Sequence, residues 1–340
     1  MTYEYNGTTI KVLEGLEAVR KRPGMYIGST GERGLHTMLY EVAQPAIGEV
    51  LLGRARRVEV VLLADGSVRV AHDSCYEHPL EQQLTVLTMP RSARGGCMVG
   101  EIGFGIGLYV VNALSDRLVA EERKDGLTAR QEYARGEPAV TARPEPANDT
   151  GTVITFRPDP EIFETVAFDR ATLAERFREL AALNRTLDLT LTDARGDAPH
   201  TERFHVSHGV REFLAHLGAD PARAVVIERE DERMGGSMEI ALAPTADGTP
   251  QLAGFANSRR TKGGTHLRGF RDGVRAALGR SARLTAVVSV KLDEPELEGC
   301  TREFLGNTPV RNCVAEAVQQ ALEAWRDEHP ERAAALTAAR

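Results

Sequence analysis

The residues with the clearest potential for chemistry lie in the run His72-Asp73-Ser74-Cys75-Tyr76-Glu77-His78-Pro79. An unperturbed histidine side chain has a pKa of about 6.5, so His72 beside Asp73 forms a pair suited to general acid/base chemistry. Cys75 is close in sequence to both His72 and His78, which suggests a nucleophile as an alternative. Because nothing in the sequence identifies a partner that stabilises the thiolate, a structural role is favoured for Cys75.

A second candidate is the glycine-rich stretch Gly100-Glu101-Ile102-Gly103-Phe104-Gly105-Ile106-Gly107. Backbone N–H groups of such loops, together with the N-terminus of a following helix, can cradle phosphate groups. A helix is expected to open within 105–115. Taken alone, a glycine cluster of this kind is weak evidence for a phosphate site.

Several elements are expected to position these residues. An amphipathic helix is predicted over 35–52, interrupted by Pro45 and Gly48. Two β-branched runs, 58–63 and 68–71, surround a glycine-containing turn and predict a hairpin. A mobile loop is expected over 84–100, and a strand over 151–156.

The second half of the chain also mixes strands with helices. Strands are predicted over 187–192, 238–242 and 285–291, and helices over 209–217 and 310–340. Pro158 and Pro160 accompany a change of composition. The pattern therefore predicts two α/β domains, 1–157 and 158–340.

Bulk composition excludes several classes of protein. The chain has 340 residues, a net charge of −7 and a pI near 5.8, which argues against a surface built throughout to neutralise phosphates. No segment has the length of apolar sequence that a membrane span needs, and no basic-then-apolar leader begins it. We therefore expect a cytoplasmic protein without membrane contact. The four cysteines lack the spacing of a zinc or disulfide framework, so no metal site is predicted.

The segment from Thr9 to Gly28, TIKVLEGLEAVRKRPGMYIG, resembles the start of the bacterial DNA gyrase B and topoisomerase IV ATPase subunits. Three later segments are similar to the gyrase B transducer: 204–206 with Gly209, 262–271, and 286–291. The resemblance covers essentially the whole chain. It implies an α+β / α/β two-domain protein, with a Bergerat (GHKL) ATPase fold followed by a ribosomal-S5-like transducer. We expect no Toprim or DNA-gate domain in these 340 residues, so this chain alone is not expected to cut or pass DNA.

The resemblance places Glu41 at the family's general base, which activates the attacking water. Four residues on, the family has a magnesium-binding Asn, where this chain has Pro45. Proline offers no side-chain ligand, and magnesium depends on near-octahedral oxygen ligation. Gln44 and Gly48 stand where the family usually has carboxylates, whereas Glu49 and its apparent partner Arg130 persist.

At the adenine end, His72 falls on the family's adenine-reading Asp, and Tyr76 falls on a glycine. The tyrosine adds bulk where the family has none, so adenine is expected to clash. Thr152, on the strand beneath adenine, is kept.

At the phosphate end, Gly105 and Gly107 align with the family's lid. Ile102 replaces a lid glycine, and Glu101 brings negative charge towards the triphosphate. Arg302, in Cys300-Thr301-Arg302, stands at the lysine of the family's Gln-Thr-Lys loop and is not a neutral replacement for it.

These replacements predict that Mg-ATP binding is lost and that no cofactor is used. The hypothesis is a recruited cleft in which Glu41, His72 and Asp73 handle protons on a small non-nucleotide molecule, in an isomerisation, cyclisation, elimination or hydrolysis. The remaining residues expected to line the former nucleotide cleft are Pro45, Cys75, Tyr76, His78, Gly105, Gly107, Tyr109, Thr152 and Arg302. The simpler alternative is that packing residues filled an abandoned site.

Two further functions stay open. One is a non-catalytic partner that pairs with itself or with a gyrase B chain, or sequesters a gyrase-directed inhibitor. The other is a weak residual ATPase. In the family an N-terminal arm crosses to the other protomer, and Tyr3 or Tyr5 could fill that place. The basic run 259–262, with Arg268 and Arg271, is expected to be a solvated loop or dimer contact rather than a nucleic-acid site.

Overall fold

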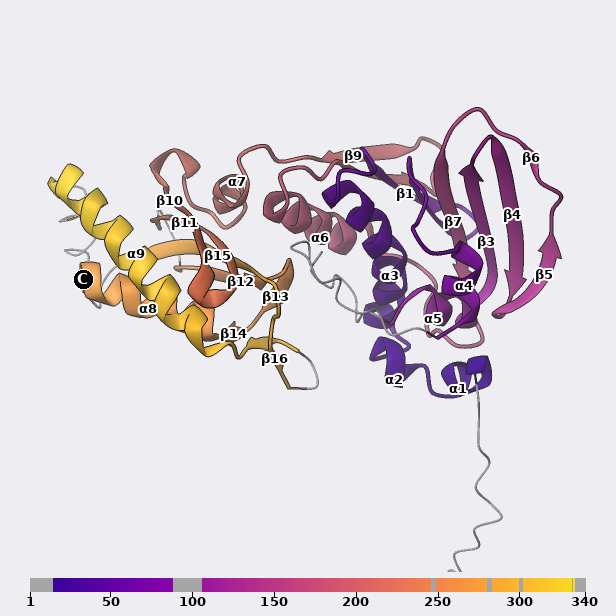
Figure 1. The fold of residues 1–340 in the computed structure, drawn as a ribbon, viewed down its shortest axis with the longest axis horizontal. Helices are drawn as coiled ribbons and strands as arrows, with labels where there is room; N and C mark the ends of the chain where they lie inside the picture. Colours follow the sequence, from indigo (N-terminus) through magenta and orange to yellow (C-terminus); the bar gives the residue numbers. More distant parts are fainter. Residues whose placement is uncertain are drawn as a thin grey trace, which may run out of the picture.

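The chain forms two modules that lie side by side along the long axis of the molecule, each built on its own β-sheet (Figure 1). The structure is a computed structural model that describes residues 15–87, 106–245, 249–279, 283–299, 302–331 and 333. Outside these ranges lie the N-terminal arm with Tyr3 and Tyr5, most of the predicted loop 84–100, and Glu101, Ile102 and Gly105. Within them, no helix is long and apolar enough to cross a membrane.

The first sheet has nine strands in the order β5-β4-β3-β7-β2-β1-β8-β9, with β6 paired to β4. Its strands are β1 Val58–Leu63, β2 Val68–His72, β3 Ser115–Lys124, β4 Leu127–Ala134, β5 Glu137–Thr141, β6 Glu145–Pro146, β7 Gly151–Pro158, β8 Leu189–Ala194 and β9 His200–Phe204. The helices of this part are α1 Gly15–Lys21, α2 Gly24–Ile27, α3 Glu32–Leu51, α4 Leu80–Thr85, α5 Leu108–Ala113 and α6 Arg170–Leu183. Strands β8 and β9 continue this sheet, so the change of sheet does not coincide with the boundary predicted at residues 157 and 158.

The predicted hairpin is confirmed as β1 and β2, which pair antiparallel from Val58 opposite His72 to Leu62 opposite Val68. Its turn contains Gly66 at φ +82°, a conformation that glycine adopts without strain. Asp65 Oδ1 accepts the Ser67 N–H at 2.9 Å and closes the turn. Thus the β-branched runs form the strands, and local turn chemistry sets their register.

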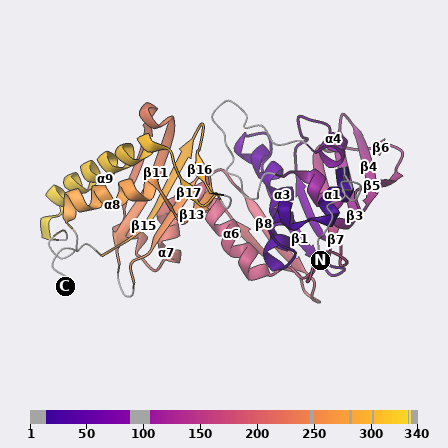
Figure 2. The same ribbon diagram turned by 90° about the horizontal axis from the view of Figure 1, so that it is seen from below.

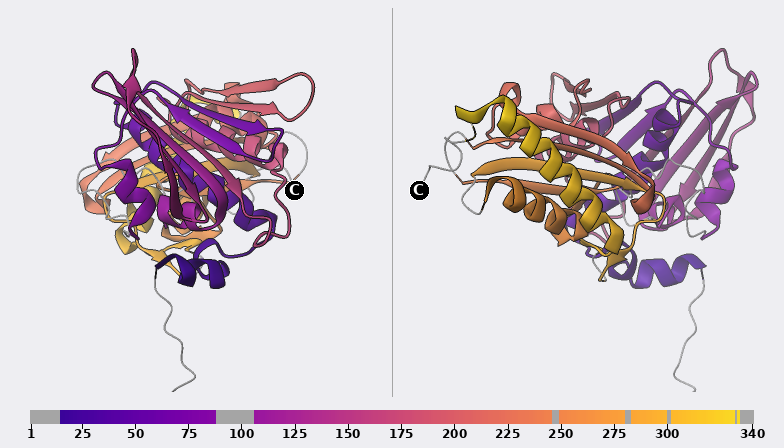
Figure 3. Two further views of the ribbon diagram at one scale, coloured as in Figure 1. Left: turned by 90° about the vertical axis from the view of Figure 1, so that its right-hand side faces the viewer. Right: turned by 60° about the vertical axis from the view of Figure 1, so that its left-hand side comes forward.

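Helix α3 covers one face of the first sheet, and no helix among the described residues lies on the opposite face (Figures 1 and 3). Its apolar side chains join the same hydrophobic core as the inward-facing residues of β1 and β2. The expectation that Pro45 and Gly48 interrupt this helix is wrong, since α3 runs without a break from Glu32 to Leu51. Packing of both ends of the helix against the core offsets the local cost of a proline.

The second sheet has the strand order β10-β11-β15-β12-β13. Helices α8 and α9 cover one face and α7 the other (Figure 2). The strands are β10 Val225–Asp231, β11 Gly236–Pro244, β12 Leu252–Ala256, β13 Arg259–Thr261 and β15 Leu284–Leu292, and the helices are α7 Val210–His216, α8 Thr265–Leu278 and α9 Thr308–Glu328. A three-stranded sheet joins β14 Gly263–Gly264, β17 Phe304–Leu305 and β16 Leu297–Glu298.

The predicted strand over 285–291 is confirmed as the middle of β15. Val288 and Val290 face the core beneath α8 and α9, whereas Val287 faces the core beneath α7. Because successive side chains of a strand point to opposite faces, a strand covered on both sides reads as a continuous apolar run.

A buried ion pair fixes α1 against the first module. Asp159 is fully buried, and its Oδ2 accepts from Arg20 at 2.6 Å and lies 3.3 Å from Arg135 Nε. Arg20 also donates to the carbonyl of Ala113, the last residue of α5, at 2.8 Å. The pair therefore joins three segments that are distant in sequence.

We predict that Asp159→Asn lowers the free energy of unfolding by about 3 kcal/mol, because removing one member of a buried pair leaves the other uncompensated. The control is Glu59→Gln, which removes an exposed ion pair with Arg57 and should cost less than about 1 kcal/mol. Urea unfolding followed by circular dichroism measures both. Equal losses in the two variants would contradict the assignment.

Candidate functional site

The Glu41 carboxylate is buried and binds the backbone that leads into α5. Its Oε2 accepts the N–H groups of Ile106 and Gly107, each at 3.1 Å, and its side chain comes from α3. Gly107 has φ +79°, which suits glycine at this turn. Two backbone donors of the glycine-rich segment are thus satisfied by the protein's own carboxylate.

Pro45 lies one helical turn after Glu41 in the uninterrupted α3. Proline has no N–H, so the usual bond from residue 45 to the Glu41 carbonyl is missing. The half-buried ring of Pro45 offers no polar side-chain atom at the position where the resemblance expects a magnesium ligand.

His72 ends β2 and is almost fully buried. Thr152 stands opposite it in β7. Neither ring nitrogen of His72 has a hydrogen-bond partner among the described residues. Burial lowers the pKa of His72 to about 4, although the charges of Glu49 and Asp73 act in the opposite direction. The imidazole is therefore neutral at pH 7 and has unused hydrogen-bonding capacity.

Tyr76 packs on His72, with ring centroids 4.9 Å apart and the rings tilted by 45°. It belongs to the core of the first module, and burial raises the pKa of its hydroxyl. Nearby, Thr152 Oγ1 donates to the Ser74 carbonyl at 2.9 Å. The aromatic pair of His72 and Tyr76, and Thr152 with its hydroxyl already hydrogen-bonded, thus occupy the region in which the sequence analysis expected a clash with adenine.

The carboxylate of Asp73, which the sequence predicted to be catalytic, is bound to Arg56. It accepts the Arg56 backbone N–H and side-chain Nε, both at 2.7 Å. Burial would raise the pKa of Asp73, but these hydrogen bonds lower it below its usual range. Among the described contacts Asp73 makes no hydrogen bond to His72, so the expected His72–Asp73 pair acts only through space.

The other cleft candidates are dispersed. Cys75 Sγ lies 3.2 Å from the Arg123 carbonyl, and burial raises the thiol pKa, which favours the structural role. His78 is exposed, and only its backbone carbonyl has a described bond, from Gln83. The Tyr109 hydroxyl faces Gly15 at the start of α1.

Glu49 does not pair with Arg130 as the sequence suggested. Arg54 binds it in a bidentate manner, at 2.8 and 2.6 Å, and Ser74 Oγ donates to it at 3.2 Å. Arg130 instead binds Glu121 and Glu132. Arg54 and Arg56 were missed, although both belong to a basic cluster just before β1 that could have marked them.

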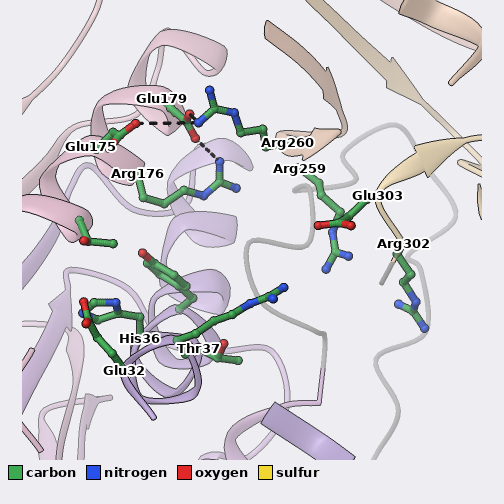
Figure 4. A pocket seen from close by; sticks show the side chains of 13 residues that line it. Glu32, His36, Thr37, Glu175, Arg176, Glu179, Arg259, Arg260, Arg302 and Glu303 are labelled. Atoms are coloured by element: carbon green, nitrogen blue, oxygen red, sulfur yellow. Dashed lines mark hydrogen bonds and ion pairs between the residues drawn. The ribbon is translucent and has the colours of Figure 1, made fainter. Parts of the chain in front are cut away.

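Arg302, the last predicted cleft residue, lies in the second module and lines a cavity of about 650 Å³ between the modules (Figure 4). Helices α3 and α6 form one wall, and β13 with residues 302–303 forms the other. The structure therefore assembles Glu41 with Gly107, and His72 with Tyr76 and Thr152, but leaves Asp73, His78, Tyr109 and Arg302 directed elsewhere.

Comparison with known proteins agrees with this fold. Residues 281–339 match the family model described as DNA gyrase B. The novobiocin-resistant DNA gyrase B protein of Streptomyces niveus is 38% identical over 98% of this chain, which spans 57% of that protein.

Two solved structures resemble the chain closely. The B-subunit of the DNA gyrase from Myxococcus xanthus has a TM-score of 0.80 and 30% identity, covering 96% of this chain and 99% of that one. The 43K ATPase domain of Thermus thermophilus gyrase B, in complex with an aminocoumarin, has a TM-score of 0.73 and 30% identity, covering 95% and 92%. The predicted GHKL ATPase fold followed by a transducer is thereby confirmed, and the chain belongs to the DNA gyrase B family.

Proposed function

We propose that this chain is a gyrase-B-like module that has lost Mg-ATP hydrolysis and whose former nucleotide cleft receives a small non-nucleotide molecule. The observation that carries the proposal is the buried His72–Tyr76 pair, in which neither imidazole nitrogen has a partner among the described residues. A buried unsatisfied polar group costs about 1–3 kcal/mol, and a ligand that supplies the missing hydrogen bonds recovers this.

The residues at the metal end do not fit Mg-ATP. Pro45 supplies no oxygen, and the Glu41 oxygen Oε2 already accepts two backbone N–H groups. Magnesium needs near-octahedral oxygen ligation and depends on protein carboxylates or amides besides the nucleotide. Glu41 at this position is consequently better placed to meet a metal-free ligand.

The residues at the adenine end also differ from those that would bind ATP. A neutral imidazole has one donor and one acceptor nitrogen, whereas a carboxylate accepts only. The partner suited to His72 is therefore a polar molecule that offers both a donor and an acceptor. Tyr76 packs against the imidazole from the core, so the surroundings of His72 are apolar and aromatic and favour a ligand with an apolar or planar part.

In its catalytic form, the proposal assigns proton transfer to Glu41 and hydrogen bonding to His72. Glu41 takes a proton from one atom of the bound molecule and returns it at another, so the protons balance in an isomerisation or cyclisation, while the neutral His72 holds the molecule through its N–H donor and its acceptor nitrogen. Elimination and hydrolysis remain variants of the same acid/base scheme. Asp73 is held by Arg56 and acts at most through its charge.

A second candidate is a non-catalytic protein that pairs with itself or a gyrase B chain, or sequesters a gyrase-directed inhibitor. It is favoured by the Thermus thermophilus relative, described in complex with an aminocoumarin, and by the relative described as novobiocin-resistant. Weak residual ATPase activity is the third alternative, because Glu41, Gly105, Gly107 and Thr152 are kept in the sequence.

We predict that a non-hydrolysable ATP analogue with magnesium leaves the melting temperature of the protein unchanged. A bound ligand at 100 times its Kd would add about 2.7 kcal/mol to the free energy of unfolding. Differential scanning fluorimetry measures this, with the Thermus thermophilus ATPase domain as positive control. A magnesium-dependent rise in melting temperature with the ATP analogue would show that the protein still binds Mg-ATP and would contradict the proposal. A rise with an aminocoumarin alone would support inhibitor sequestration.

The pH dependence of stability tests the state of His72. Its pKa is lowered from 6.5 to about 4 in the folded protein, so between these pH values the unfolded chain binds the extra proton. The free energy of unfolding therefore falls as the pH is lowered through this window, by on the order of 3 kcal/mol from His72.

His72→Phe should remove this contribution while keeping an aromatic ring against Tyr76. The exposed His78→Gln serves as control and should retain the wild-type pH dependence. The urea unfolding midpoints of wild type and both variants, measured from pH 7 to pH 4, test this prediction. Parallel curves for His72→Phe and wild type would show that His72 is not the desolvated group.

Glu41→Gln separates an enzyme from a binding protein. The amide oxygen still accepts from Ile106 and Gly107, so the fold should persist, but proton transfer is removed. For a metabolite that wild type transforms, we expect turnover to fall by roughly a hundredfold or more. Unchanged turnover would exclude Glu41 as the base, and binding without turnover by wild type would support the non-catalytic alternative.

A further inference from the structure

Helix α6 lies at the junction of the two modules and belongs to the hydrophobic cores of both (Figures 1 and 2). Phe177 and Leu180 pack in the core of the first module. Ala182 and Leu183, at the end of the helix, pack in the core beneath α7 together with Phe255 of β12. The chain returns from α6 to the first sheet through β8 and β9 before it enters α7, so α6 joins the modules by packing rather than as the covalent link.

The two-residue turn between β12 and β13 meets α6 through Ser258. The Ser258 carbonyl accepts from the Arg176 side chain at 2.9 Å. Asn184, directly after α6, donates to the Ser258 hydroxyl at 3.1 Å, and its own amide oxygen accepts from Lys291 of β15 at 3.2 Å. Hydrogen bonds thus connect this turn and the neighbouring strand of the second module to α6 and the residue that follows it.

A buried carboxylate reinforces this contact. The Glu179 side chain is 3% exposed, and its two oxygens lie 2.8 Å from Arg176 of α6 and 2.9 Å from Arg260 of β13 (Figure 4). These three residues form a triad that joins the two modules. Moving β13 away from α6 would leave the desolvated Glu179 with one counter-ion instead of two, which is unfavourable.

The backbone of the turn has a conformation that serine rarely adopts. Asn257 and Ser258 have φ angles of +47° and +66°. Two-residue turns of this kind favour glycine at the second position, because glycine has no side chain that resists a positive φ. Such strain persists where the surrounding structure fixes the residue, and it points to a function. The hydroxyl that glycine would lack is the group that binds Asn184.

Another contact joins the same end of α6 to the second sheet. Arg185, next to Asn184, lies 2.7 Å from Glu239 of β11 and also pairs with Glu228 of β10. Arg185 and Glu228 are both exposed. Exposed ion pairs contribute little to stability, so the buried contacts of Ser258 and Arg260 are the ones we expect to hold the junction.

We propose that Ser258 and Arg260 form a latch that holds the second module on α6 and makes the two modules behave as one body. Domains of one chain are otherwise expected to move relative to each other unless a large apolar interface joins them. The inference goes beyond the proposed function, and its test needs no ligand. With the latch closed, the two modules should unfold in a single transition.

The aromatic residues supply a separate probe for each module. The chain has one tryptophan, Trp325, which lies in α9 of the second module, whereas all seven tyrosines lie within residues 3–133. Tryptophan fluorescence therefore reports on the second module, and tyrosine absorbance reports on the first. We expect urea unfolding of the full wild-type chain to give the same midpoint with both signals.

In the double variant Ser258→Gly/Arg260→Gln we expect the two midpoints to separate by on the order of 0.5 M urea. Glycine relieves the positive φ, so this change by itself should not disturb the turn. Coincident midpoints in the double variant, or separate midpoints in wild type, would overturn the proposal. If the double variant does not fold, Ser258→Gly alone decides: separated midpoints support the latch, and midpoints that stay together contradict it.

Each substitution has a matched control within one module. Arg311→Gln removes an ion pair with Asp272 between α9 and α8, and the Arg311 side chain is 51% exposed compared with 54% for Arg260. Asp125→Gly relieves a φ of +53° in the turn between β3 and β4. Both controls should move the tryptophan and tyrosine midpoints together. Separation in either control would show that the effect does not depend on the junction, and would likewise overturn the proposal.

Discussion

The bond between the Glu41 carboxylate and the backbone before α5 holds together two of the elements that carry the predicted cleft residues. It fixes α3, the helix at the centre of the first module, to a segment 65 residues later in the chain. Both N–H groups are ones that a phosphate could have used. Since a buried carboxylate must be hydrogen-bonded, this contact satisfies both partners without a nucleotide. The continuity of α3 through Pro45 keeps Glu41 in place despite a missing helical bond.

Changes around this contact are chemically consistent with one another. The resemblance to gyrase B places Pro45 at a metal-ligand position, the neutral His72 at an acceptor position and Tyr76 at a glycine position, and our proposal rests on these three correspondences. By contrast, the core of α3, β1 and β2 stays apolar and continuous. Fold and cleft chemistry depend on different residues, so a gyrase B framework can be retained while its ligand changes.

A group of charged side chains also joins the two modules. Glu179 is desolvated between Arg176 and Arg260, and a buried carboxylate of this kind is stable only while its counter-ions remain. Because the two arginines belong to different modules, any movement between the modules would disturb the triad.

The sequence by itself determined the family, the hairpin and the apolar strand β15, because these depend on local periodicity and on long motifs. Charged strands such as β3 and β4 were not predicted, since many of their side chains are exposed or half-buried and the alternation of apolar and polar residues is weak. The ion-pair partners of Asp73 and Glu49 could not be predicted from the sequence, because they depend on which of several arginines lies nearest in the folded chain. Only the tertiary structure placed Asp73 on Arg56, Glu49 on Arg54, and the arginines of two modules around one cavity. These contacts join residues distant in sequence, and packing alone brings them together.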